Sequence, residues 1–370
     1  MSIALLGGLT AREFMKSHWQ RRPLLVRGAI PSFAPVVSRT ELLALAARDD
    51  VESRLVRNTG RSGWALAHGP IARSSLPPLR QPGWTLLVQG VDLHHDAAHR
   101  LLQAFRFVPD ARLDDLMVSW ASDGGGVGAH VDSYDVFLLQ ASGRRRWRIA
   151  RRYDAALDTR APLKVLRRFV AEQEHVLEPG DLLYLPPHWA HEGVAVGGDC
   201  MTYSIGMRAP KRGSLAGELV QRLAETYDDS ALYADPRQRA TATPAAIPPA
   251  LAAFAAEAVR RLARRPGAVA RALGEVLSEP KPRVWFQTRA TAWRPRAVAL
   301  DRRTRMLYDA RHVFINGESV RVRGRDAALL HRLADERQLD ARAVRSASRV
   351  VRSALADWFK AGWVALADAR

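Results

Sequence analysis

The pattern of hydrophobic and polar positions between residues 113 and 208 is that of a β-sheet protein. Short apolar runs such as Leu116–Trp120 and Leu182–Leu185 are separated by segments that contain Gly and Pro. Pro and Gly occupy the two central positions of Glu178–Asp181, as in a type II turn, and Ala141–Gly143 is expected to form a hairpin turn between two strands. Short strands joined by turns predict a small barrel or sandwich.

Helical patterns occur before and after this region. Thr10–Glu13 matches a capping box, which marks the start of a helix, and Asp92–Phe107 is expected to form another helix. From residue 214 to 276, leucines four positions apart share one helix face. Three prolines among small residues make 241–249 a linker between helices.

The last ninety residues combine strands and helices. Val313–Val322 is built around Asn316-Gly317, the strongest short-range signal for a β-hairpin. Helices are expected at about 325–337 and 349–361. A hairpin beside short helices resembles a winged helix-turn-helix. The expected domains are residues 1–210, 211–279 and 280–370.

Composition adds a question about charge. Of the 370 residues, 47% are hydrophobic and 25% charged, which is ordinary for a globular protein, but the net charge is +18. Only five of the 56 basic residues are Lys, so the arginine excess can equally reflect a GC-rich genome. Residues 281–370 hold 20 basic and 9 acidic residues, and this basic tail predicts contact with RNA or a ribonucleoprotein.

Cysteine content and hydropathy indicate a cytoplasmic protein. The chain has one cysteine, Cys200, which excludes a disulfide framework and suits a reducing compartment. No apolar run approaches the ~18 residues that span a bilayer, and Ile3–Leu9 is a poor signal peptide. We therefore expect no membrane association.

A candidate metal site begins at His130-Val-Asp132. Residues i and i+2 of a strand project from the same face, so this His and carboxylate would point into the barrel together. The third ligand is His191 or His188, and His191 is preferred because His188 follows two prolines in a turn. Two imidazoles and one carboxylate leave three coordination positions open, which suits Fe(II), O2 and a bidentate 2-oxo acid. A zinc hydrolase could use the same ligands.

The distal carboxylate of such a 2-oxo acid co-substrate needs a cation inside the barrel, and three consecutive arginines, Arg144–Arg146, are candidates. Arginine meets a carboxylate with two parallel hydrogen bonds. Strand alternation places Arg144 and Arg146 on one face and Arg145 and Trp147 on the other. The pattern alone does not say which pair faces inward.

The chain resembles the JmjC oxygenases, and among them the bacterial ribosomal oxygenases that hydroxylate an arginine of a large-subunit ribosomal protein. The resemblance is close over residues 10–236. It rests on the following segments: His18–Ala29, Gly124–Phe137, Gly143–Arg148, Glu178–Pro187, His191–Gly193 and Tyr203–Pro210.

This resemblance implies an α+β protein: a double-stranded β-helix (cupin/JmjC) barrel, a helical dimerisation segment and a winged-helix-like C-terminal domain. It implies Fe(II), 2-oxoglutarate and O2 as cofactor and co-substrates, and a homodimer that acts on a ribosomal protein. The implied site residues are the iron ligands His130, Asp132 and His191, the 2-oxoglutarate partner Arg145, and the substrate pocket of Asp115, Met117, Tyr134 and Ser204. Thr202 departs from the family, where Asn is expected, and Trp189-Ala190 before His191 is also unusual.

Two other functions remain open on the sequence. The same oxygenase chemistry could act on a histidine or a methylated lysine, because Asp115 favours a cationic side chain without choosing among them. Alternatively, the barrel could be the scaffold of a non-catalytic module that binds RNA or the ribosome. The complete set of metal ligands argues against that alternative.

Overall fold

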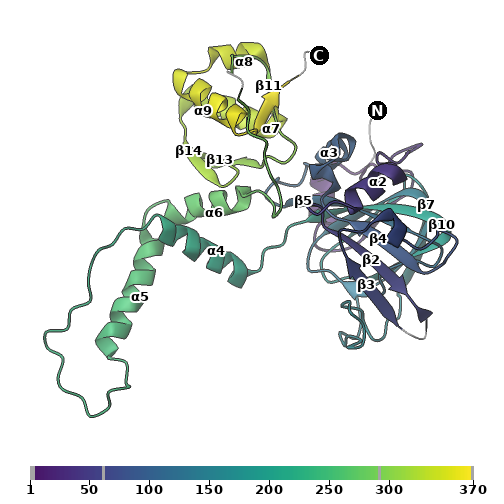
Figure 1. Ribbon diagram of the computed structural model, residues 1–370, viewed down its shortest axis with the longest axis horizontal. Coiled ribbons are helices and arrows are strands. Elements are labelled where there is room, and N and C mark those ends of the chain that lie inside the picture. The colour runs from purple at the N-terminus through teal and green to yellow at the C-terminus, as the bar shows by residue number, and fades with distance from the viewer. Residues whose placement is uncertain (1–4, 61–62, 291–292, 368–370) are drawn as a thin grey trace. The chain divides into compact units, whose positions relative to one another are not determined.

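The computed structural model describes residues 5–60, 63–290 and 293–367. The chain forms two compact units, Met1–Ala209 and Pro210–Arg370 (Figure 1). The first unit is a large antiparallel sheet with short helices, and the second contains longer helices and two small sheets. This is the predicted α+β organisation.

The first unit is built on a ten-stranded sheet in the order β1-β9-β7-β10-β5-β4-β2-β3, with β6 paired to β10 and β8 paired to β7. Its strands are β1 (Leu24–Val26), β2 (Ser53–Asn58), β3 (Trp64–His68), β4 (Trp84–Val88), β5 (Leu113–Ala121), β6 (His130–Val131), β7 (Val136–Ala150), β8 (Gln173–Leu177), β9 (Leu182–Leu185) and β10 (Ala190–Met207). Its helices are α1 (Ala11–Ser17), α2 (Arg39–Ala46) and α3 (Asp96–Gln103).

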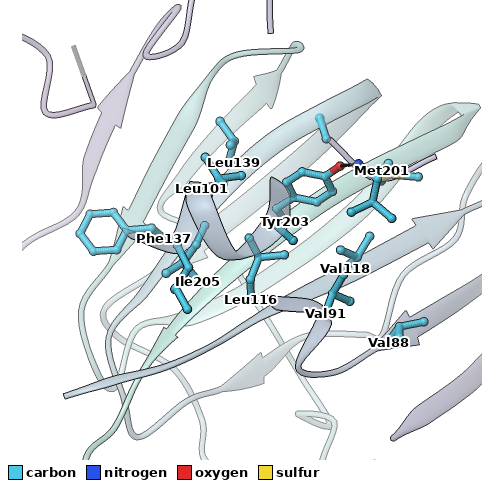
Figure 2. Packing of buried hydrophobic residues seen from close by; sticks show 14 of the residues in the cluster. Val88, Val91, Leu101, Leu116, Val118, Phe137, Leu139, Met201, Tyr203 and Ile205 are labelled. Carbon is cyan, nitrogen blue, oxygen red and sulfur yellow. Dashed lines mark hydrogen bonds between the residues drawn. The ribbon is translucent and has the colours of Figure 1, made fainter. Parts of the chain in front are cut away.

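The main hydrophobic core lies between one face of this sheet and the three helices. Phe14 of α1, Leu42 of α2 and Leu101 of α3 pack in the same cluster as Phe137 and Tyr203 of the sheet. Figure 2 shows part of this packing, with Leu101 of α3 among strand residues such as Phe137 and Tyr203. Burying such apolar side chains is the dominant favourable term in folding. Because the helices cover this face, the opposite face is left to form a cavity.

The predicted hairpin turn at Ala141–Gly143 is wrong. β7 is one continuous strand that pairs with β10 along nearly its whole length. Gly143 has φ +63°, and a Cβ there would lie 2.9 Å from the carbonyl oxygen of Asp199 on β10. The register of the pairing shifts between Val196 and Met201. The glycine marks a bulge, which shares with a turn the need for a positive φ.

This bulge changes which residues of β7 face the cavity. Before it, Val136 and Leu138 point inward, and after it Arg145 and Trp147 do so. The inward positions therefore change from even to odd within one strand, as an extra residue in a strand requires.

Several local predictions are confirmed. Thr10 and Glu13 form both hydrogen bonds of a capping box. Gly180 has φ +91°, and the N–H of Asp181 donates to the carbonyl of Glu178, as expected for the turn there. The predicted helix at 92–107 is shorter than expected, because α3 begins at Asp96 and a 3-10 turn (Val91–Leu93) precedes it.

The second unit begins with the helices α4 (Arg212–Glu225), α5 (Pro249–Arg264) and α6 (Ala268–Ser278). Its strands are β11 (Val298–Leu300), β12 (Met306–Tyr308), β13 (His312–Ile315), β14 (Glu318–Arg321), β15 (Gln338–Leu339) and β16 (Val364–Leu366), and its remaining helices are α7 (Gly324–Glu336), α8 (Ala341–Ser346) and α9 (Arg349–Lys360). The Asn316-Gly317 hairpin and the two late helices match their predictions.

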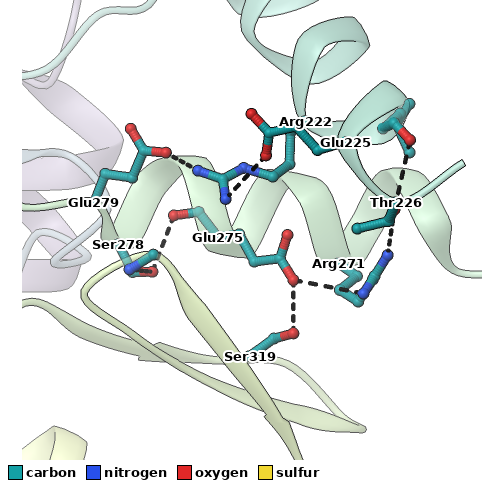
Figure 3. Close-up of polar contacts among 10 residues, drawn as sticks. Arg222, Glu225, Thr226, Arg271, Glu275, Ser278, Glu279 and Ser319 are labelled. Carbon is teal, nitrogen blue, oxygen red and sulfur yellow. Dashed lines mark hydrogen bonds and ion pairs between the residues drawn. The ribbon is translucent and has the colours of Figure 1, made fainter.

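Polar contacts join α6 to this hairpin. The hydroxyl of Ser319 donates to Glu275, and the N–H of Gly317 donates to the hydroxyl of Ser278 (Figure 3). Arg222 of α4 contacts Glu279 at the end of α6. Within the described residues, no helix combines the length and the apolar character needed to cross a membrane.

Candidate metal centre

A cavity of about 440 Å³ opens on the sheet face that the helices leave free. Strands from most of the sheet line it, from β2 and β3 through β5 to β7 and β10. Its lining includes His130, Asp132 and His191, together with Arg145. The sheet therefore curves around one cavity that contains the predicted metal ligands and the predicted carboxylate partner.

His130, Asp132 and His191 converge on one point. One ligand atom from each lies within 4.8 Å of the others. The Nε2 atoms of His130 and His191 are 3.9 and 3.6 Å from Oδ2 of Asp132. These separations are too long for good hydrogen bonds but suit three ligands that surround a common ion at about 2 Å. No other group of this kind was found among the described residues.

Backbone carbonyls orient both imidazoles. Nδ1 of His130 lies 3.0 Å from the carbonyl oxygen of Gly128, and Nδ1 of His191 lies 2.9 Å from that of Trp189. A carbonyl only accepts, so each Nδ1 carries the proton and donates it. Each Nε2 lone pair is then free to bind a metal, and the ring orientation is fixed.

Electrostatics keep His191 neutral. Burial and the neighbouring His130 lower the pKa of His191 to about 4. A neutral imidazole is the form that binds a metal. His188, the alternative third ligand, is exposed and does not belong to the converging group. It adopts φ +64°, and its N–H donates to the carbonyl of Asp132.

Arg145 is the second notable feature of the cavity. It is only 3% exposed, and its Nε and Nη2 atoms are buried without a hydrogen-bond partner. Arg144 and Arg146 are exposed, so Arg145 and Trp147 form the inward pair. A buried guanidinium without a partner is costly, and a carboxylate in the cavity would supply the missing acceptors. The lining thus fits a metal ion and an acid with two carboxylates.

Three of the four predicted substrate-pocket residues line the same cavity: Met117, Tyr134 and Ser204. Met117 on β5 and Ser204 on β10 are directly paired. Burial, followed by the charges of Asp132 and Asp115, raises the pKa of Tyr134 far above its usual range, so its hydroxyl stays protonated. Asp115 is buried and is not among the lining residues; its Oδ2 accepts from the N–H of Gly90.

Thr202, the departure from the family, is buried and is not among the lining residues. Its hydroxyl donates to Oε1 of Gln140, the residue opposite on β7. Sequence reasoning also missed lining residues, among them Arg54 on β2 and Gln89 after β4. Only the curvature of the sheet brings β2 to the cavity, and no motif in residues 31–110 marks it.

Comparison with known proteins gives consistent matches for both units. A family model described as a JmjC domain matches residues 100–215, and one described as a ROXA-like winged helix matches residues 260–365. The chain is 36% identical over 270 residues to the ribosomal protein uL16 3-hydroxylase of Escherichia coli, which covers 73% of this chain and 71% of that protein.

Solved structures agree with the sequence match. The X-ray structure of E. coli YcfD covers 97% of this chain and 98% of its own, with 30% identity and a TM-score of 0.85. A structure of this E. coli ribosomal oxygenase in complex with cobalt and 2-oxoglutarate has the same coverage and identity, with a TM-score of 0.81. The chain therefore belongs to the JmjC-domain ribosomal oxygenases.

Proposed function

We propose that this protein is an Fe(II)- and 2-oxoglutarate-dependent hydroxylase that acts on an arginine side chain of the large-subunit ribosomal protein uL16. One observation carries the proposal: the convergent His130, Asp132 and His191 share a cavity with the unpaired guanidinium of Arg145. The uL16 substrate follows from the E. coli relative.

In this proposal, His130, Asp132 and His191 hold the iron, and Arg145 pairs with the distal carboxylate of 2-oxoglutarate. The E. coli structure is a complex with cobalt and 2-oxoglutarate, which supports a metal ion and 2-oxoglutarate as the groups that this cavity would hold. When bound, iron and 2-oxoglutarate consume O2, release succinate and CO2, and place one oxygen atom into a substrate C–H bond. The contribution of the protein is to position these groups and to exclude water.

The substrate end of the cavity suits an arginine. Met117 and Tyr134 would contact its methylene groups, and Ser204 would accept a hydrogen bond from its guanidinium. Asp115 is buried outside the cavity lining, with its Oδ2 bonded to Gly90, and its carboxylate would accept a further hydrogen bond from the guanidinium. Ser204 and Met117 face each other across paired strands, so one polar and one apolar contact lie side by side. A histidine side chain is shorter and would fill less of the cavity beside Met117 and Tyr134. A methylated lysine would offer fewer hydrogen-bond donors to Asp115.

A peptide assay tests the proposal. Purified enzyme with Fe(II), 2-oxoglutarate and O2 is incubated with the uL16 segment that contains the target arginine, and with versions in which histidine or trimethyl-lysine replaces it. We expect the arginine peptide to gain the mass of one oxygen atom in step with succinate formation. Hydroxylation of the histidine peptide alone, or demethylation of the lysine peptide, would contradict the arginine assignment.

The helices of the second unit support a homodimer. α5 buries none of its residues within the chain, and it exposes Leu251, Phe254 and Val259. An apolar stripe of this kind favours burial against a second copy. Sedimentation should therefore give a dimer, and Phe254→Asp should shift it towards the monomer. A monomeric wild-type protein would contradict this part of the proposal.

The basic winged helix supports contact with ribosomal RNA. Six arginines around α7, α8 and α9 are exposed and have no ion-pair partner among the described residues: Arg321, Arg323, Arg325, Arg342, Arg345 and Arg349. Affinity for an rRNA fragment should fall steeply with salt and weaken in an Arg345→Gln, Arg349→Gln variant. Affinity that does not depend on salt would argue against RNA contact.

An enzyme that acts on a ribosomal protein and contacts ribosomal RNA would be located in the cytoplasm.

A further inference from the structure

A second arginine lines the cavity without a role in the chemistry above. Arg54 lies on β2, at the far side of the curved sheet from Arg145. Its Nε is buried without a hydrogen-bond partner, and no ion pair of its guanidinium is found among the described residues. The side chain is half-buried, so water compensates it only in part. Another cation of the same cavity, Lys164, is exposed, so water can compensate more of its charge.

The position of Arg54 relative to the reacting end follows from strand register. Arg54 lies opposite Leu87 on β4, and Leu87 lies opposite Ser119 on β5, the strand that also carries Met117. With neighbouring strands ~4.8 Å apart, the Arg54 backbone is roughly 10 Å from β5. An extended substrate segment advances about 3.3 Å per residue. Arg54 would therefore face a substrate residue about two or three positions away from the target residue that contacts Met117.

Charge indicates what Arg54 requires. In the loaded centre, the charges of Fe(II), 2-oxoglutarate, Asp132 and Arg145 sum to zero, so this centre offers Arg54 no net negative charge. A cationic substrate side chain would not compensate it either, since like charges repel. What remains is an oxygen acceptor on the segment that flanks the target, and a guanidinium offers such an acceptor several donors in a fixed geometry.

We propose that Arg54 is a substrate-binding residue that donates hydrogen bonds to an acceptor oxygen of the substrate segment, either a main-chain carbonyl or a carboxylate, two or three residues from the hydroxylated side chain. The inference rests on the proposed hydroxylase function. It adds a contact remote from the iron that fixes how the segment lies across the cavity.

The test compares Arg54→Gln with Arg57→Gln. Arg57 lies on the same strand but is exposed and does not line the cavity. Peptide affinity is measured on enzyme loaded with Co(II) and 2-oxoglutarate, which does not turn over, and kcat and KM are measured with Fe(II). Losing a hydrogen bond from a charged group should raise the peptide Kd and KM of Arg54→Gln about 10–100-fold. The kcat at saturating peptide and the affinity for 2-oxoglutarate should change little, and Arg57→Gln should match wild type.

A second peptide distinguishes the two acceptors. In it, every Asp and Glu of the uL16 segment is replaced by Asn or Gln. If Arg54→Gln weakens both peptides equally, the acceptor is a main-chain carbonyl; if only the natural peptide is weakened, it is a carboxylate. Arg54→Lys keeps the positive charge but lacks the planar guanidinium with its several N–H donors. It should therefore restore part of the affinity.

Two results would overturn the inference. One is an unchanged peptide Kd in a folded Arg54→Gln protein, with its Tm as the check on folding. The other is a loss of 2-oxoglutarate affinity as large as the loss of peptide affinity, which would make Arg54 a co-substrate residue. Either result can occur while wild type hydroxylates the peptide. Failure of the hydroxylase proposal is therefore distinct: wild type would not hydroxylate any of the peptides.

Discussion

His130 on β6 and His191 on β10 lie directly opposite each other in paired antiparallel strands, with their ring centroids 4.2 Å apart. Backbone hydrogen bonds of the sheet therefore set the distance between these two candidate ligands. Asp132 follows two residues after His130, and its Oδ2 faces both Nε2 atoms. The site is preorganised by strand pairing and does not depend on long loops.

Removing any of the three converging side chains should abolish turnover. His130→Ala, Asp132→Ala and His191→Ala each take away one of three ligands, whereas the exposed His188→Ala should keep most activity. Succinate formation and the rise in Tm on adding Fe(II) without O2 measure the two effects. If His191→Ala kept its activity and His188→Ala lost it, the third ligand would be His188 and the choice of His191 would be wrong.

Arg145→Ala should raise the requirement for 2-oxoglutarate far more than that for the peptide. Separating a buried charge pair typically costs about 3–5 kcal/mol, and no hydrogen-bond partner among the described residues compensates Nε and Nη2 of Arg145. Arg144→Ala is the matched control, because Arg144 is exposed on the other face. The Kd of 2-oxoglutarate, measured with Co(II), should be almost unchanged in the control. Equal losses in both variants would disprove the inward assignment of Arg145.

Asp115→Asn should weaken hydroxylation of an arginine peptide and spare metal and 2-oxoglutarate binding. An amide oxygen can still accept from the N–H of Gly90, so the local fold should survive. Loss of one charge-assisted hydrogen bond suggests about 1.5–3 kcal/mol, or roughly 10–100-fold in kcat/KM. Replacing the target arginine by lysine in the peptide should cost a similar factor. Unchanged kcat/KM in Asp115→Asn would exclude Asp115 from substrate binding.

Asp135 should be a stability residue. It is fully buried and accepts hydrogen bonds from the Tyr184 hydroxyl at 2.6 Å and from Nε2 of Gln20 at 2.9 Å, with Arg112 at 3.4 Å. Asp135→Ala removes the acceptor of the Tyr184 hydroxyl and the Gln20 amide and the buried charge partner of Arg112, and it should lower the free energy of unfolding by about 3–5 kcal/mol. Denaturant titration measures this change. The exposed Asp228→Ala should stay within about 0.5 kcal/mol of wild type; equal effects would exclude a special role for Asp135.

Gly143→Ala should disturb the bulge in β7. A left-handed φ costs a residue with a side chain about 1–2 kcal/mol, and the new Cβ would lie 2.9 Å from the Asp199 carbonyl oxygen. Because Arg145 follows two residues later, the affinity for 2-oxoglutarate should fall together with the Tm. Gly213→Ala on α4 has open space around it and should be tolerated. An unchanged Tm and 2-oxoglutarate affinity in Gly143→Ala would show that the bulge is not required.

Sequence patterns predicted best where the physics is local. Capping at Thr10 and the hairpin at Asn316-Gly317 depend on neighbouring residues alone, and both were correct. The spacing of His130 and Asp132 was also sufficient to bring them together. The choice of His191 relied on where a strand should resume, and the structure has β10 beginning at Ala190.

Features that depend on tertiary structure could not be predicted in this way. Glycine in Ala141–Gly143 signals a positive φ, which fits a turn and a bulge equally, and only the pairing of β7 with β10 decides between them. Alternation left two choices for the inward arginine, and the family resemblance was needed to prefer Arg145. Asp135 is bonded to Gln20 and Tyr184, which are far away in the sequence, and only the curvature of the sheet brings Arg54 to the cavity.

The irregularity shared by β7 and β10 has a consequence for how this protein tolerates substitution. It separates two blocks of sheet, each with its own register: Ala190–Val196 with Arg144–Ala150, and Thr202–Gly206 with Val136–Gln140. The first block carries His191 and Arg145, and the second carries Ser204. A shift in one block that changes which side chains point into the cavity need not change the orientation of side chains in the other block. Substitutions in the second block could therefore change the proposed substrate contact while the proposed metal and 2-oxoglutarate contacts of the first block stay in place.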